Sequence, residues 1–175
     1  VMAAEGFSRW NESYAKGEIN RRVCVHAFLD DKEGWQYLPW NHRGWHAGGA
    51  ANNTHISFGM CEPPGFRYSG GATMVGYDAA KNEAYFRACF NNSVELCAML
   101  CKTYGSTEGN IIRHREVYSK GIAPNSADVM HCFPKHGENT ETSRAAGAKS
   151  PAGAQEKPPP APDPVSAGQP GRPSL

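Results

Sequence analysis

Two side chains in the second half of the sequence have the types and order of a catalytic zinc site. His114 follows the apolar pair Ile111 and Ile112 and precedes a loop that reaches Asp128, with His131 as the nearest alternative to the carboxylate. Imidazole and carboxylate groups are common zinc ligands, and a catalytic zinc takes three protein ligands and a water molecule. The chain must therefore supply a third ligand and a general base, and whether it does so decides its chemistry.

A second group of chemically versatile side chains lies in residues 40–49, which read Trp-Asn-His-Arg-Gly-Trp-His-Ala-Gly-Gly. Aromatic rings offer a large apolar face, and an imidazole both donates and accepts hydrogen bonds. Glycine lets a backbone approach a ligand closely. The same composition also describes a surface loop around a packed tryptophan, and composition alone favours neither interpretation.

Length and charge limit the classes of function. The chain has 175 residues, the size of one domain with its own core, and a formal net charge of +1. This balance gives no electrostatic case for binding to nucleic acid or to an anionic membrane surface, and we expect neither as a partner. No apolar run approaches the roughly 20 residues of a membrane helix, and no signal-peptide pattern opens the sequence.

The six cysteines do not have the spacing of a structural metal site. They form no Cys-x-x-Cys pair and no close cysteine–histidine finger pattern. Cys97 and Cys101 lie one helical turn apart beside Leu96 and Leu100, so we expect them to fill a core as small apolar residues. Disulfide pairing stays open at this point.

Composition changes near residue 146. Residues 147–175 contain eight of the thirteen prolines and almost no large apolar side chain. Such a segment cannot bury enough surface to offset its ordering entropy, so we expect a folded domain over 1–146 and a disordered linker or tail over 147–175. A truncated multidomain protein and a plain tail both fit this pattern.

Hydrophobic periodicity predicts the elements that must position these side chains. In chain order they are a helix over 2–15, strands over 23–29, 35–38 and 55–61, a helix over 79–104, and a short strand over 110–113 that delivers His114. Asp78 is placed to cap the long helix and Gly105 to end it. This order predicts an α/β fold with a central mixed β-sheet flanked by helices.

Four segments together resemble a known family. They are residues 23–30, residues 38–48 with Trp-His-Ala-Gly at their end, residues 52–56, and residues 113–117. In this order they are similar to the zinc-dependent N-acetylmuramoyl-L-alanine amidases, the type 2 amidases related to peptidoglycan recognition proteins and found in phage endolysins and bacterial autolysins. The resemblance runs from about residue 3 to about residue 144.

The resemblance implies a fold, a reaction and a place of action. Its members have a mixed sheet flanked by helices, with zinc in a groove that holds a glycan-linked stem peptide. They hydrolyse the amide between N-acetylmuramic acid and L-alanine in bacterial peptidoglycan, outside the cell. Zinc lowers the pKa of its bound water to about 7, a carboxylate handles the proton, and a cation stabilises the oxyanion.

The resemblance also assigns residues. His114 falls on the family's second histidine ligand, and Asp128 falls on the last ligand, which is Cys or Asp across the family. The residues placed along the substrate groove are Trp45, His46, His26 and Asn53.

Three family features are not matched. The first zinc histidine lies on a strand before the first helix, where this sequence begins, so we expect an N-terminally truncated domain with its first strand missing. Gly59 stands at the position of the proton-handling Glu, and Ser126 stands where a His or Lys precedes the last ligand. Glu62 lies on the opposite face of that strand. We therefore expect weak or absent catalysis, with a peptidoglycan-binding module or a degenerate fragment as the alternatives.

Overall fold

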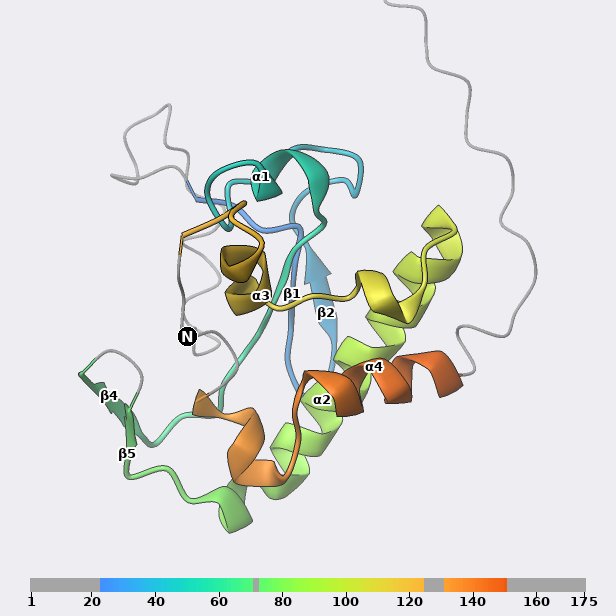
Figure 1. The fold of residues 1–175 in the computed structure, drawn as a ribbon. Helices are drawn as coiled ribbons and strands as arrows, with labels where there is room; N and C mark the ends of the chain where they lie inside the picture. Colours follow the sequence, from blue (N-terminus) through green and yellow to red (C-terminus); the bar gives the residue numbers. More distant parts are fainter. Residues whose placement is uncertain (1–22, 71–72, 125–130, 151–175) are drawn as a thin grey trace, which may run out of the picture.

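The computed structural model describes residues 23–70, 73–124 and 131–150. Its elements are β1 (Ala27–Leu29), β2 (Gly34–Gln36), α1 (Ala51–Thr54), β3 (Phe58–Met60), β4 (Arg67–Ser69), β5 (Thr73–Val75), α2 (Ala79–Tyr104), η2 (Glu108–Asn110), α3 (His114–Ser119), η4 (Phe133–His136) and α4 (Thr140–Lys149). The expected α/β architecture is confirmed (Figure 1). The helix predicted over 2–15 and residues 151–175 of the predicted tail lie outside these segments.

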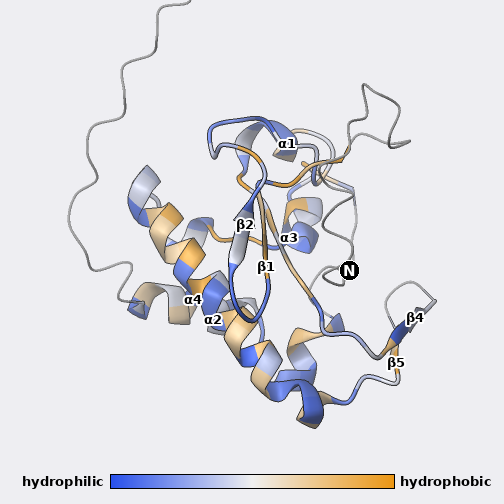
Figure 2. Ribbon diagram, turned by 180° about the vertical axis from the view of Figure 1, so that it is seen from behind, coloured by the Kyte–Doolittle hydropathy of each residue, from blue (hydrophilic) through white to orange (hydrophobic). Residues whose placement is uncertain are grey.

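β1 is the central strand of a three-stranded mixed sheet. It pairs with β2 in the antiparallel sense and with β3 in the parallel sense, and β4 and β5 form a separate hairpin. All three residues of β1 are buried, and Figure 2 shows this strand as hydrophobic along its length, whereas β2 is more polar. A strand covered on both faces needs a continuous apolar run, which the segment around Phe28 provides.

The predicted long helix is α2, and it is capped by the two expected residues, Asp78 at its start and Gly105 at its end. The Asp78 carboxylate accepts a hydrogen bond from the Lys81 N–H at 3.0 Å, and Gly105 ends the helix with φ = 63°. Phe86, Phe90 and other residues of its first half are buried against β5 and η4 in the main core. Although α2 has 26 residues, neither it nor any other helix in the described segments is apolar enough to cross a bilayer.

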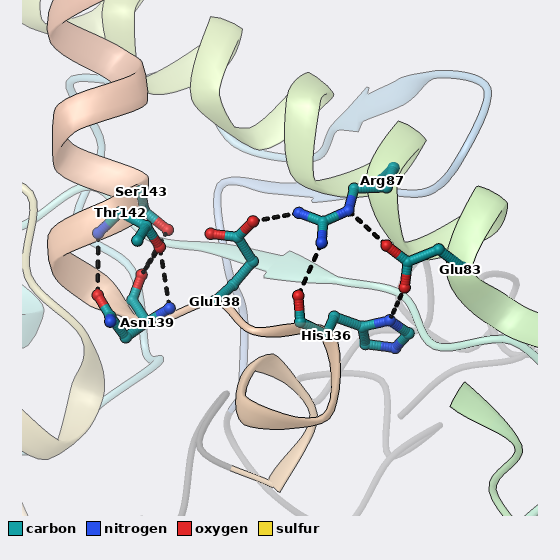
Figure 3. Close-up of polar contacts among 7 residues, drawn as sticks. All are labelled: Glu83, Arg87, His136, Glu138, Asn139, Thr142 and Ser143. Carbon is teal, nitrogen blue, oxygen red and sulfur yellow. Dashed lines mark hydrogen bonds and ion pairs between the residues drawn. The ribbon is translucent and has the colours of Figure 1, made fainter. Parts of the chain in front are cut away.

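A polar network joins α2 to the segment around η4 (Figure 3). The Arg87 guanidinium donates to the carboxylates of Glu83 and Glu138 and, at 2.7 Å, to the His136 carbonyl oxygen. The buried His136 ring stacks on Phe86 with centroids 4.0 Å apart. These contacts fix the chain that leads into α4 against the long helix.

The domain boundary expected at residue 146 falls inside a helix. The Asn139 side chain caps α4 by accepting from the Thr142 N–H at 2.9 Å, and the helix continues to Lys149. Gly147 is buried within van der Waals reach of the Ile111 side chain. Ser150 is buried as well, so the packed part of the chain continues at least four residues past the expected boundary.

The strand predicted over 110–113 is wrong. Residues 108–110 form the 3-10 helix η2, and His114 is the first residue of the helix α3. The Ile111 N–H bonds back to the Glu108 carbonyl at 3.0 Å, and the Glu116 carboxylate accepts from the Arg113 N–H at 2.9 Å. Local turn and capping bonds replace strand pairing, because no strand of the described segments pairs with this stretch.

Candidate active-site cavity

One cavity of about 1280 Å³ runs along β3 and the long helix α2. Four imidazoles line it. One is His131, and the other three are His46 and its neighbours His55 and His114, called the histidine group below. The volume exceeds the roughly 300–1,000 Å³ of most small-molecule sites. The cavity is therefore suited to an extended ligand, and the structure brings the predicted His46 and His114 into one wall.

The charge state of His46 is set by its surroundings. Burial, followed by the nearby histidines 26, 55 and 114, lowers its pKa to about 4 against the opposing effect of the His55 carbonyl. The His46 Nε2 lies 3.1 Å from that carbonyl oxygen and donates its hydrogen to it. His46 is therefore neutral at pH 7, with the Nδ1 lone pair as its accepting side.

Asn52 organises the loop that carries His46, and sequence reasoning did not single it out. Its amide oxygen accepts hydrogen bonds from the backbone N–H groups of His46, Ala47 and Gly48 at 3.0, 3.0 and 3.1 Å. The side chain is 4% exposed. The two adjacent asparagines after Gly48 and Gly49 could have indicated this role. A loop with several unpaired backbone N–H groups needs a side-chain acceptor close by in the sequence.

The same loop is docked on the segment that leads towards Asp128. A Cβ at Gly49 would lie 2.6 Å from the Ile122 carbonyl oxygen, and a Cβ at Gly48 would lie 2.9 Å from the Pro124 ring. Both glycines also have positive φ values. Glycine at these two positions therefore permits a backbone contact that any side chain would block.

Trp45 presents an aromatic surface beside this loop. It is 41% exposed, and the Arg43 guanidinium lies 4.3 Å from its ring centroid. The Arg43 Nε donates to the Asn53 amide oxygen, which ties the guanidinium in place. The predicted residues Trp45 and Asn53 thus belong to one exposed cation–aromatic cluster, with Asn53 acting through Arg43.

His26 does not lie where a ligand could reach it. The residue is 1% exposed, and its Nδ1 accepts from the Ser57 N–H at 3.1 Å while its Nε2 donates to the His42 carbonyl at 2.8 Å. Its ring also stacks on Trp40. The predicted substrate contact for His26 is corrected accordingly: both ring nitrogens are used inside the fold, where they hold the loop to the sheet.

The space beside Gly59 is filled by a ring from the neighbouring strand. Phe28 and Gly59 are direct partners in the parallel pairing of β1 and β3. A Cβ at Gly59 would lie 2.5 Å from Phe28 Cε1 and 2.7 Å from Cδ1. The position that the family resemblance reserves for a proton-handling carboxylate is therefore closed as well as lacking a side chain.

The described residues do not complete a zinc site by themselves. His114 lines the cavity, whereas the predicted ligand Asp128 and the predicted cation position Ser126 lie outside the described residues. No three His, Cys, Asp or Glu side chains in the described segments are grouped closely enough to hold a metal. His131, the alternative ligand, instead places its Nε2 2.8 Å from a Glu62 oxygen.

The cysteines also stay out of metal chemistry within these segments. All six are free thiols, and Cys61, Cys89 and Cys132 are buried. Burial raises the pKa of the Cys61 and Cys89 thiols to about 12. These two thiols are therefore protonated at neutral pH. Cys97 and Cys101, which were expected to fill the core, are only partly buried and line the cavity.

Comparison with known proteins identifies the fold. The family described as N-acetylmuramoyl-L-alanine amidase matches residues 2–128. A probable N-acetylmuramoyl-L-alanine amidase of Bacillus licheniformis is 30% identical over 125 residues, which cover 68% of this chain and 33% of that protein. The chain thus spans about a third of the length of this curated relative.

Two solved structures share the fold at 17% sequence identity. The Staphylococcus aureus hydrolase AmiA, crystallised with its ligand, superposes with a TM-score of 0.63 over 84% of this chain and 65% of AmiA. A mutant form of PlyL superposes with a TM-score of 0.53 over 73% of this chain and 68% of PlyL. Both confirm the fold class expected from the sequence.

Proposed function

This chain belongs to the N-acetylmuramoyl-L-alanine amidase family, and we propose that it acts on bacterial peptidoglycan by hydrolysing the amide between N-acetylmuramic acid and L-alanine. The observation that carries the proposal is the cavity of about 1280 Å³ that the histidine group lines, formed largely by the segment that matches the family. Its volume suits a glycan-linked peptide, and the neutral His46 can bind a polar group of that ligand.

His114 and Asp128 are proposed as two ligands of a zinc ion. When bound, zinc would polarise the scissile carbonyl and supply a nucleophilic water. No three His, Cys, Asp or Glu side chains in the described segments form a metal site by themselves, so a complete ligand set includes at least one residue outside them, and Asp128 is proposed as that residue. Stoichiometric zinc binding measured by calorimetry, and its loss in His114→Ala, tests this assignment separately from activity.

The reaction is tested on purified peptidoglycan with the zinc-loaded chain. Cleavage at the proposed bond releases a new α-amino group on L-alanine, which N-terminal derivatisation identifies, and it lowers the turbidity of a cell-wall suspension. Release of sugar reducing ends without free alanine amines would contradict the assignment. His114→Ala serves as the inactive control.

A non-catalytic peptidoglycan-binding module is the second candidate, and the Phe28–Gly59 pairing favours it specifically. A Phe ring in place of a carboxylate removes the group that moves the proton, a loss of typically about 10²–10⁴ in rate. This candidate predicts that the chain cosediments with insoluble peptidoglycan and releases no alanine amine. Cosedimentation with clearance would eliminate it.

We infer that the chain acts at the cell wall, outside the cell, because its proposed substrate is there. The near-neutral charge supports peptidoglycan over nucleic acid as the partner. Whether the source protein is an endolysin or an autolysin is tested by locating it in wall fractions of growing cells and of phage-lysed cells. Presence only in the soluble cell interior would contradict an action at the wall.

A further inference from the structure

A second polar group lies in the cavity wall, apart from the histidine group. Glu62 lies two residues after the end of β3, and one of its carboxylate oxygens, Oε1, accepts hydrogen bonds from the Tyr68 hydroxyl at 2.6 Å and from the His131 Nε2 at 2.8 Å. The Glu62 and His131 side chains are only 10% and 18% exposed. All three residues line the cavity.

Two atoms of this group are buried and have no hydrogen-bond partner among the residues that the structure describes. They are the second carboxylate oxygen of Glu62, Oε2, and the Nδ1 of His131. In the tautomer that donates from Nε2 to Glu62, the Nδ1 of His131 carries a lone pair. Buried acceptors are almost always satisfied in folded proteins, so two on one pair of residues indicate a donor-rich group that belongs there.

The surroundings favour a positively charged donor. The Glu62 carboxylate contributes a negative charge in a mostly enclosed position, and the Tyr68 ring meets the His131 ring edge-on with centroids 5.2 Å apart. Tyr77 adds a further aromatic ring to the same wall. Aromatic faces attract cations, and a primary ammonium has three N–H donors for the two orphaned acceptors.

The distance between the two polar groups matches an extended peptide. His55 lies before β3 and Glu62 after it, seven residues further along a largely extended stretch. At roughly 3.3 Å per residue, His55 and Glu62 lie up to about 23 Å apart along the cavity lining. A peptide of about six or seven extended residues spans that length.

We propose that Glu62 and His131 bind a primary ammonium group carried by a peptide ligand, at the end of the cavity away from the histidine group. The inference rests on the proposed function in that the ligand is the peptide part of peptidoglycan. It adds a charge requirement: the peptide carries a free amine where it passes Glu62, and acylation of that amine blocks the contact.

The test compares two synthetic peptides by calorimetry at about pH 8, where imidazole side chains are generally neutral. Both have the sequence Ala-Glu-Lys-Ala with blocked termini, and they differ only in a free or acetylated lysine amine. We expect the full chain to bind the free-amine peptide at least tenfold more tightly. Glu62→Gln should reduce that preference to less than twofold, whereas Glu95→Gln, which removes an equal charge from an exposed position of α2, should keep it.

A direct readout ties the effect to this pair of residues. The ¹⁵N resonance of the His131 Nδ1 should shift on addition of the free-amine peptide and stay unchanged with the acetylated one. If Glu62→Gln does not fold, Tyr68→Phe removes one donor from Oε1 and leaves both orphaned acceptors, so it should retain the preference.

Equal affinity of the two peptides for the unaltered chain, as a bound water molecule in place of the amine would give, overturns the inference. Preference retained in Glu62→Gln, or no binding of either peptide at millimolar concentration, overturns it as well. Release of alanine amines from peptidoglycan is measured independently, so the proposed function can stand when this inference fails.

Discussion

The replacement Gly59→Glu restores the residue type that the family resemblance places at this position. The Phe28 ring, however, occupies the space that the new side chain needs. A Cβ there would lie 2.5 Å from the Phe28 ring, well inside any normal contact. Phe28 cannot move aside easily, because it is 8% exposed, sits in the central strand and packs edge-on against Tyr37 at 5.9 Å. Overpacking of this kind costs about 1–3 kcal/mol. We therefore expect a destabilised protein with no gain in turnover.

A double variant separates steric exclusion from other causes. Phe28→Ala alone should lose about 3–5 kcal/mol by leaving a cavity in the core. In Phe28→Ala/Gly59→Glu the new side chain occupies that space, so the two losses should not add, and a coupling of at least about 1 kcal/mol is expected between these paired residues. If the losses of unfolding free energy in Phe28→Ala and Gly59→Glu simply add in the double variant, the proposed clash is contradicted.

The measurement is urea unfolding followed by tryptophan fluorescence, together with alanine-amine release from peptidoglycan. Gln36→Glu, at an exposed position of the neighbouring strand β2, is the control for adding a carboxylate to the same sheet. The reasoning is refuted if the unfolding free energy of Gly59→Glu lies within about 0.5 kcal/mol of that of the unaltered chain, the range of an ordinary surface substitution. It is refuted equally if that single change produces substantial turnover.

Three further predictions concern the loop, the histidines and the thiols. Asn52→Leu should lose about 1–3 kcal/mol in urea unfolding and speed amide exchange at residues 46–48, because three loop donors lose their acceptor. The folded-state pKa of His46, about 4, lies below its unfolded value, so the unfolded chain binds the proton first. Stability should be full above about pH 6.5 and fall as the pH approaches 4, by about 1–2 kcal/mol at pH 5, measured as a shift of the urea midpoint. Cys61 and Cys89 should react with iodoacetamide at pH 7 far more slowly than in the unfolded chain, as read by mass spectrometry, because burial raises both pKa values to about 12.

Each of these has a control and a contrary result. Asn53→Leu alters the neighbouring amide that faces Arg43, and equal losses in both variants would contradict the special role of Asn52. His46→Gln should flatten the pH dependence between about 6.5 and 4, and an unchanged slope would assign it to another group. Labelling of Cys89 as fast as in urea would show that its thiol is accessible.

Where the determining interactions are local, the sequence alone was sufficient. The long helix starts at Asp78 and ends at Gly105, because a side-chain cap and a left-handed glycine act within a few residues. The turn at Asp30 forms in the same way, with its carboxylate accepting from the N–H groups of residues 32 and 33. The order of the motifs identified the family, and the family match covers most of the chain.

Only the tertiary structure decided the features that depend on a partner distant in sequence. The stretch before His114 has strand-like residues but no pairing strand in the described segments, so capping bonds make it a turn followed by a helix. His26 was predicted as a groove residue, but Ser57 and the His42 carbonyl use both its nitrogens. From the sequence, Gly59 was interpreted as the loss of a catalytic carboxylate. The pairing of β1 with β3 shows in addition that the Phe28 ring occupies the space beside Gly59. Close packing leaves no room there for a second side chain.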